Sequence, residues 1–203
     1  MSRVAFLVAH EGIEQVELTQ PWQAVRDAGH EPVLLSTTDG EVQAFDHLDK
    51  ADTFPVDQQV SQADVGDFAA VVLPGGVANP DALRTDEDAV RFVRAAMEAG
   101  TPVAAICHAP WTLVETQQLV GRRLTSWPSL RTDITNAGGD WVDSELVVDR
   151  AGAGPLVTSR NPDDLPVFCE ALVELLDGSL EDALEDSGSV VEGTEALSKD
   201  PAS

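Results

Sequence analysis

The chain of 203 residues contains only two lysines, Lys50 and Lys199, and no tyrosine. Acidic residues outnumber basic ones by 36 to 12, so the formal net charge is −24. Nucleic acids and anionic membranes are both bound through basic surfaces, so this balance argues against either kind of partner. In dilute buffer, so many negative side chains repel one another and destabilise the folded chain. In molar salt, where the Debye length falls to about 3 Å, this repulsion is screened. The composition therefore predicts a protein of a salt-accumulating halophile.

Long apolar segments and cysteine pairs are also missing. No apolar run approaches the roughly 18 residues of a membrane span, and the start of the chain enters a strand pattern rather than a signal peptide. We therefore expect a soluble cytoplasmic protein. Its two cysteines, Cys107 and Cys169, are expected to be free thiols. The four scattered histidines and the absence of a CxxC pair give no support for a metal site.

Short apolar runs alternate with helical patterns along the chain. The predicted strands are 3–10, 32–36, 54–60, 69–73, 102–106, 146–149 and 156–158, with a short segment at 124–127. The predicted helices are 14–29, 86–100, 110–120, 129–137 and 163–176. This alternation predicts an α/β fold with a mostly parallel sheet covered by helices on both faces. Residues 1–176 are expected to form one domain, and the acidic segment 177–203 a disordered tail, with a short helix over 179–186 as the alternative.

Three polar segments follow predicted strands directly. They are residues 10–14, the pair Gly75-Gly76 and the pair Cys107-His108. In an open parallel sheet, ligands bind at the carboxyl ends of the strands. The three segments are therefore expected to meet at one site.

Cys107 stands at a turn from a buried strand into a helix. A thiol at a helix start has a lowered pKa, so this placement is compatible with a thiolate nucleophile. A buried structural cysteine is an equally good interpretation of the placement alone. The backbone N–H groups of Gly76 and His108 are candidate donors to an oxyanion.

Glu14 lies in the first of these segments, where its carboxyl group could hydrogen-bond the sulfur of Cys107. A carboxyl beside a thiolate is expected to be protonated, because two close anions are disfavoured. Glu17 is expected to face solvent or a neighbouring subunit. The spacing leaves open whether the ring of His108 serves Cys107. Four further residues are given no role: His10 lies near the site without a partner, His30 and His47 are expected on the surface, and Cys169 in the core.

At these residues the chain resembles the ThiJ/PfpI superfamily, also called the parkinsonism-associated deglycase superfamily, and in particular its PfpI-type intracellular protease and stress-protein branch. The similar stretches are GIEQVEL (12–18), VVLPGGVANPDALR (71–84), PVAAICHAP (102–110), TSWPSLRTDITNAGGDWVDSELVVD (125–149) and TSRNPDDLPVFC (158–169). They span residues 3–176. The resemblance implies a flavodoxin-like three-layer sandwich similar to class I glutamine amidotransferases. The distant His-x-Glu pair of those enzymes is missing, because no histidine follows His108.

The resemblance also implies a set of catalytic residues. It makes Cys107 the nucleophile with His108 beside it, Glu14 the acid that contacts the sulfur, and Gly76 and His108 the oxyanion donors. A third triad acid would be Asp81 from a neighbouring subunit, which implies a homo-oligomer, either a dimer or a hexamer. The chain departs from the family pattern at Asp81, where some members have Glu, and at Ala109, where Gly is usual.

Three functions are compatible with this reading. The leading hypothesis is a cofactor-independent glyoxalase or protein deglycase that acts on small carbonyl compounds or glycated proteins through Cys107. The first alternative is an intracellular cysteine peptidase or amidase that uses Cys107, His108 and Asp81. The second alternative is a non-enzymatic redox sensor or chaperone in which Cys107 is oxidised.

Overall fold

The computed structural model describes residues 1–179 and centres on a seven-stranded sheet with the order β11-β12-β8-β7-β1-β3-β6. All neighbouring strands are parallel except β11 and β12. The strands are β1 (Arg3–Val8), β3 (Glu31–Ser36), β6 (Gln58–Gln59), β7 (Ala70–Leu73), β8 (Val103–Ile106), β11 (Val147–Asp149) and β12 (Leu156–Ser159). The predicted strand pattern is confirmed for this sheet, except at 54–60, where only Gln58–Gln59 belongs to it.

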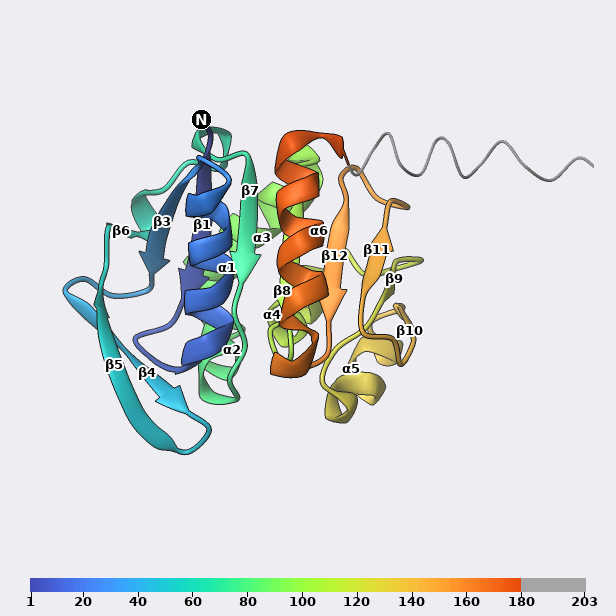
Figure 1. Cartoon of the computed structure of the whole chain (residues 1–203). Helices are drawn as coiled ribbons and strands as arrows, with labels where there is room; N and C mark the ends of the chain where they lie inside the picture. The colour runs from blue at the N-terminus through green and yellow to red at the C-terminus, as the bar shows by residue number, and fades with distance from the viewer. Residues whose placement is uncertain (180–203) are drawn as a thin grey trace, which may run out of the picture.

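The helices cover both faces of this sheet. They are α1 (Gln15–Asp27), α2 (Ala78–Leu83), α3 (Glu87–Ala99), α4 (Pro110–Glu115), α5 (Arg131–Asn136) and α6 (Leu165–Asp177). Helices α1 and α6 pack against each other on the near face in Figure 1, and α3 lies behind the sheet. The structure therefore has three layers, as predicted. Helix α4 ends five residues before the predicted limit, and α2 was not predicted because it is only six residues long.

Strand β1 shows how the sequence builds two cores. Val4, Phe6 and Val8 point to the core beneath α1 and α6, while the alternate residues Ala5 and Leu7 point to the core beneath α3 and α4. Both sets are completely buried, as expected for a strand with helices on each side. This explains the uninterrupted apolar run at the start of the chain.

A second, three-stranded sheet contains β2 (Glu11–Glu14), β4 (Glu41–Asp46) and β5 (Asp49–Pro55). The sequence pattern did not reveal the β4–β5 hairpin, because β5 is mostly exposed and has no apolar alternation. The carboxyl ends of the parallel strands point toward the bottom of Figure 1, where α2 and the turn of this hairpin also lie. The hairpin therefore reaches the end of the sheet where the three polar segments meet. A two-stranded sheet of β9 (Arg123–Leu124) and β10 (Asp140–Trp141) completes the structure.

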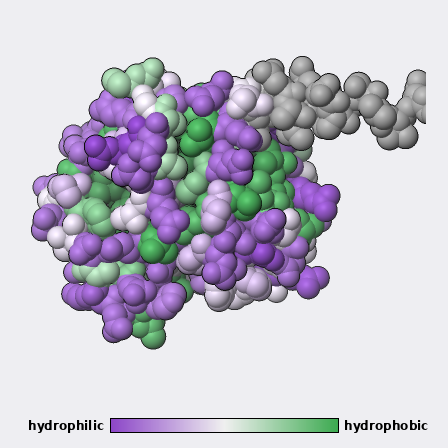
Figure 2. Space-filling view, in the orientation of Figure 1, coloured by the Kyte–Doolittle hydropathy of each residue, from purple (hydrophilic) through white to green (hydrophobic). Residues whose placement is uncertain are grey.

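Hydrophilic residues cover much of the face shown in Figure 2, and apolar residues fill the spaces between them. Within residues 1–179, no helix is both long and apolar enough to cross a membrane. The predicted acidic tail begins inside the last turn of α6, and its residues 180–203 lie outside the described part of the chain.

Candidate active site

Cys107 follows β8 directly and has a φ of 62°, in the left-handed region that side chains other than glycine rarely adopt. The backbone N–H of Cys107 donates to the carbonyl of Ser159 at 3.0 Å, and its carbonyl accepts from the N–H of Trp127 at 2.8 Å. These bonds to two other segments hold the turn in its strained conformation. Strained turns of this kind, between a strand and a helix, present the nucleophile in α/β-hydrolase enzymes.

The acid in contact with the sulfur is Glu17 rather than Glu14, so the predicted contact of Glu14 is wrong. Glu17 lies in the first turn of α1 and is completely buried. Its Oε2 accepts the N–H of Gly75 at 2.8 Å, and the carboxyl group also hydrogen-bonds the thiol of Cys107. The expectation that Glu17 faces solvent or another subunit is therefore also wrong. The spacing gave a signal, because Glu17 lies four and eight residues before the buried Pro21 and Val25.

Burial sets the protonation of this pair. It raises the pKa of Glu17 to about 8, so the carboxyl group keeps its proton at neutral pH. Burial, followed by the neighbouring Glu17, also raises the pKa of the Cys107 thiol, although the backbone N–H groups of His108 and Gly76 favour the thiolate. The sequence-based expectation of a lowered thiol pKa is wrong, because desolvation outweighs those two donors. The first proton lost by the pair leaves one negative charge that the two groups share.

The double glycine leaves room for this contact. A Cβ atom on Gly75 would collide with the carboxyl group of Glu17 and lie 2.8 Å from the Cβ of Cys107. Gly76 has a φ of 79° and lies against the carbonyl of Gly12. Asn79, which the sequence analysis did not single out, fixes the loop by donating to the carbonyls of Pro74 and Gly75 at 2.9 and 3.1 Å. The N–H groups of Gly76 and His108 thereby both reach the sulfur of Cys107.

The ring of His108 lies beside the sulfur of Cys107, which the spacing had left open. Its Nδ1 is 3.1 Å from the Sγ of Cys107. The ring stacks on Trp127 with centroids 5.5 Å apart and contacts Trp111 at 5.6 Å. Burial lowers the pKa of His108 to about 4, so the imidazole is neutral at physiological pH. A neutral imidazole can accept the thiol proton.

A cavity of about 380 Å³ opens above Cys107. It is lined by Glu11, Gly12, Glu14, Glu17, Phe45, His47, Leu48, Gly76, Val77, Ala78, Cys107, His108, Trp127 and Pro162. The hairpin turn thus supplies part of its wall, and His47 belongs to the site although it is exposed as predicted. A cavity of about 420 Å³ beside α3 contains no cysteine or histidine.

Other predicted residues lie outside this cavity. Asp81 is exposed on α2 and does not line it within this one chain. His10 pairs with Glu11 on the surface at 3.5 Å. His30 is more buried than expected, and its ring lies 3.4 Å from Asp177 and accepts the N–H of Ser2 at 3.3 Å. Cys169 packs against the core beneath α1 and α6, as predicted.

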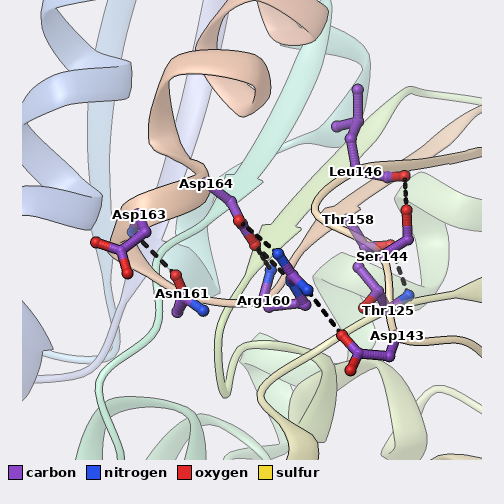
Figure 3. Close-up of polar contacts among 9 residues, drawn as sticks. All are labelled: Thr125, Asp143, Ser144, Leu146, Thr158, Arg160, Asn161, Asp163 and Asp164. Carbon is purple, nitrogen blue, oxygen red and sulfur yellow. Dashed lines mark hydrogen bonds and ion pairs between the residues drawn. The ribbon is translucent and has the colours of Figure 1, made fainter.

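A salt-bridge network around Arg160 supports residues 160–164, the segment that follows β12 (Figure 3). Arg160 donates from Nε and Nη2 to the two carboxylate oxygens of Asp164, each at 3.0 Å, and from Nη1 to Asp143 at 2.8 Å. Asp164 is nearly buried and also accepts the backbone N–H of Arg160 at 2.9 Å. The network fixes the segment that places Ser159 against Cys107 and Pro162 in the cavity wall.

Comparison with known proteins agrees with this fold. The profile of the DJ-1/PfpI family matches residues 2–175. Deglycase TK1284 of Thermococcus kodakarensis is 37% identical over 84% of this chain and 97% of its own length. Protein/nucleic acid deglycase 2 of Escherichia coli is also 37% identical, over 86% of this chain and 97% of its own. YraA of Bacillus subtilis, named as a candidate cysteine protease, is 36% identical over 87% of this chain and 99% of its own.

Solved structures show the same likeness. A two-domain protein of Anabaena variabilis with DJ-1/ThiJ/PfpI-like and ferritin-like domains has a TM-score of 0.79 and 35% identity, over 88% of this chain and 48% of that protein. DJ-1beta of Drosophila melanogaster has a TM-score of 0.74 and 26% identity, over 92% of this chain and 98% of its own. The protein belongs to the DJ-1/PfpI family, within which relatives carry deglycase and cysteine-protease names.

Proposed function

We propose that this protein is a cysteine-dependent glyoxalase or deglycase that converts small 2-oxoaldehydes, free or as adducts on proteins, into 2-hydroxy acids. The observation that carries the proposal is the contact of the Cys107 thiol with two proton-transfer groups, Glu17 and His108, at the base of a small cavity. Five of the matched relatives are named deglycases, which supports the same reaction class.

An adduct on a protein first loses its C–N or C–S bond, which returns the amine or thiol to the protein and frees the aldehyde. The reaction of the aldehyde then begins with proton transfer from the thiol of Cys107. Because burial disfavours a free thiolate, the proton passes to Nδ1 of His108 as Sγ bonds to the aldehyde carbon. The aldehyde oxygen then carries the negative charge, next to the N–H groups of Gly76 and His108. His108 returns the proton to this oxygen, which gives a hemithioacetal on Cys107.

An internal redox step follows. In its ionised form, Glu17 removes the proton from the carbon bonded to sulfur. The electron pair of that C–H bond forms the C=C bond of an enediolate. Glu17 returns this proton to the neighbouring carbon, while the hydroxyl proton of the first carbon moves to the second oxygen. The product is a thioester of the 2-hydroxy acid on Cys107. Water cleaves the thioester, which releases the acid and restores the thiol. These steps require no cofactor, and the role expected for Glu14 passes to Glu17.

The proposed active enzyme is a homo-oligomer in which Asp81 of one subunit approaches His108 of another. Asp81 is exposed on α2, near the loop that carries Gly76, so its position permits such a contact. The substrates are small carbonyl compounds or glycated proteins, and neither nucleic-acid binding nor membrane binding is part of the proposal.

The test is lactate formation from methylglyoxal in molar KCl. We expect Cys107→Ser to abolish it and Glu17→Gln to lower kcat by about a hundredfold, while Cys169→Ser remains close to wild type. Turnover that survives in Cys107→Ser would overturn the proposal. A folded wild type that makes no lactate, and instead gains two oxygens on Cys107 under mild peroxide, would favour the redox sensor.

A cysteine peptidase or amidase is the second candidate. The distance of 3.1 Å between Sγ of Cys107 and Nδ1 of His108 is that of a nucleophile and its general base. Hydrolysis of a fluorogenic peptide by the same preparation, lost in Cys107→Ser, would favour this candidate. We expect lactate formation to exceed peptide cleavage, because the cavity of about 380 Å³ suits a small substrate.

A further inference from the structure

We propose that Asp133 is a positioning residue for His108 and acts through the indole of Trp111. The inference rests on the proposed function, because it concerns the proton transfer between Cys107 and His108. It adds to that step a residue that does not line the cavity.

Hydrogen bonds fix only one side of the His108 ring. Its Nδ1 lies 3.1 Å from the Sγ of Cys107, and no group within residues 1–179 hydrogen-bonds its Nε2. A general base beside a nucleophile is usually oriented by a third group. Here the ring lies against two indoles instead, those of Trp111 and Trp127, at centroid distances of 5.6 and 5.5 Å. The placement of these indoles therefore sets the direction in which Nδ1 points.

Asp133 links the two indoles. Trp111 lies in the first turn of α4, and its Nε1 donates to Oδ2 of Asp133 at 2.8 Å. Asp133 lies in the first turn of α5, on the segment that begins with Trp127. The start of this segment is also fixed, because the N–H of Trp127 donates to the carbonyl of Cys107 at 2.8 Å. Residues 127–133 thus connect the backbone of Cys107 to the indole of Trp111.

The surroundings of Trp111 support this role. Asp133 is half-buried, and a hydrogen bond to a carboxylate is stronger than one between neutral groups. The guanidinium of Arg84 lies 5.6 Å from the centre of the Trp111 ring, and Arg84 itself pairs with Glu115 on α4. Trp111 is therefore held at its N–H by a carboxylate and over its ring by a cation.

The experiment measures the reactivity of Cys107 without a carbonyl substrate. Iodoacetamide alkylates the thiol at neutral pH: Sγ displaces iodide, and the thiol proton passes to Nδ1 of His108. Peptide mass spectrometry follows the modification of Cys107 in molar KCl. Circular dichroism shows whether each variant is folded.

Asp133→Ala removes the acceptor and should slow alkylation about tenfold, because the general base is no longer aligned with the thiol. Trp111→Phe keeps an aromatic ring but loses the N–H, so the same loss is expected, and it carries the test if Asp133→Ala does not fold. Asp133→Asn keeps an oxygen that accepts the indole N–H and should stay within about twofold of wild type. Ile134→Val, at the completely buried next position of α5, loosens the packing but leaves this bond, so its rate should not change.

A double variant tests whether Asp133 acts through Trp111. If it does, Asp133→Ala combined with Trp111→Phe should react no more slowly than either single variant. With methylglyoxal as substrate, Asp133→Ala should lower kcat about tenfold and leave KM unchanged, because the aligned base acts only in the chemical step.

Alkylation at the wild-type rate in Asp133→Ala would overturn the proposal, and so would additive losses in the double variant. Asp133→Asn or Ile134→Val reacting as slowly as Asp133→Ala would overturn it too. The proposed function can fail separately: alkylation that depends on Asp133, without lactate formation, removes the enzyme assignment and leaves the positioning role. Lactate formation with an unchanged kcat in Asp133→Ala does the reverse.

Discussion

The carboxyl group of Glu17 is held between the N–H of Gly75 and the thiol of Cys107. Both side chains are almost completely buried, so the pair keeps its protons where exposed groups of its kind would ionise. The thiol of Cys107 and the carboxyl group of Glu17 thus titrate together, and this coupling governs both the stability and the reactivity of the site.

The first prediction concerns Glu17→Gln. Folded Glu17 holds its proton up to a pKa of about 8, whereas unfolded Glu17 loses it near 4.5. Stability is therefore lost as pH rises between these values, because the unfolded chain gains by ionising first. Gln has no such penalty, so its melting temperature should exceed that of wild type by a margin that grows from pH 5 to pH 8. We expect about 5–10 °C at pH 8.

Calorimetry from pH 5 to pH 8 measures the difference in melting temperature between Glu17→Gln and wild type. Glu31→Gln is the control for the loss of an exposed carboxylate. A margin independent of pH would show that Glu17 is ionised in the folded protein.

The second prediction concerns Gly75→Ala. Because the added methyl group would collide with Glu17 and crowd Cys107, we expect a loss of about 2 kcal/mol in the free energy of unfolding and slower alkylation of Cys107. Gly66→Ala is the matched control, since its methyl group would meet only Asp64, at 3.4 Å. Urea denaturation measures both. Equal stability of the two variants would contradict the packing described for Gly75.

The third prediction concerns the stacking of Trp127 on His108. Trp127→Ala exposes the imidazole, so the pKa of His108 should rise from about 4 toward its ordinary 6.5, because burial is what lowers it. Trp127→Phe keeps an aromatic face and should change the pKa less. NMR titration of the ring measures both variants. An unchanged pKa in Trp127→Ala would show that other residues bury the ring.

The fourth prediction concerns the salt-bridge network of Arg160. Arg160→Ala leaves the nearly buried Asp164 without its guanidinium partner and should cost about 2–3 kcal/mol of stability. Arg91→Ala removes an exposed pair with Asp88 and should cost at most about 0.5 kcal/mol. Chemical denaturation compares them. Similar losses of stability in the two variants would mean that the burial of Asp164 does not make its ion pair with Arg160 stronger than an exposed pair.

The fifth prediction follows from the net charge of −24. If self-repulsion limits stability, the melting temperature should rise by about 10 °C or more between dilute buffer and molar KCl. The halophilic origin inferred from the composition stays a prediction, and a melting temperature that does not respond to salt would argue against it.

The pattern of apolar residues was sufficient to predict the layered fold. Strands buried on both faces, such as β1, have continuous apolar runs that helices do not share. The hairpin of β4 and β5 escaped prediction because an exposed edge strand needs no such pattern. For the same reason, the position of His47 in the cavity wall was not predicted. Only the pairing of the hairpin with a distant segment brings His47 to the cavity.

The sequence by itself determined the parallel sheet and the position of Cys107 at a strand end, because both follow from local periodicity and chain order. Only the tertiary structure decided which acid meets the sulfur. Glu14 and Glu17 are three residues apart, and the choice depends on where β2 ends and how α1 is rotated against the sheet. Tertiary structure also decided the charge states, because the pKa values of Glu17, Cys107 and His108 are shifted mainly by burial.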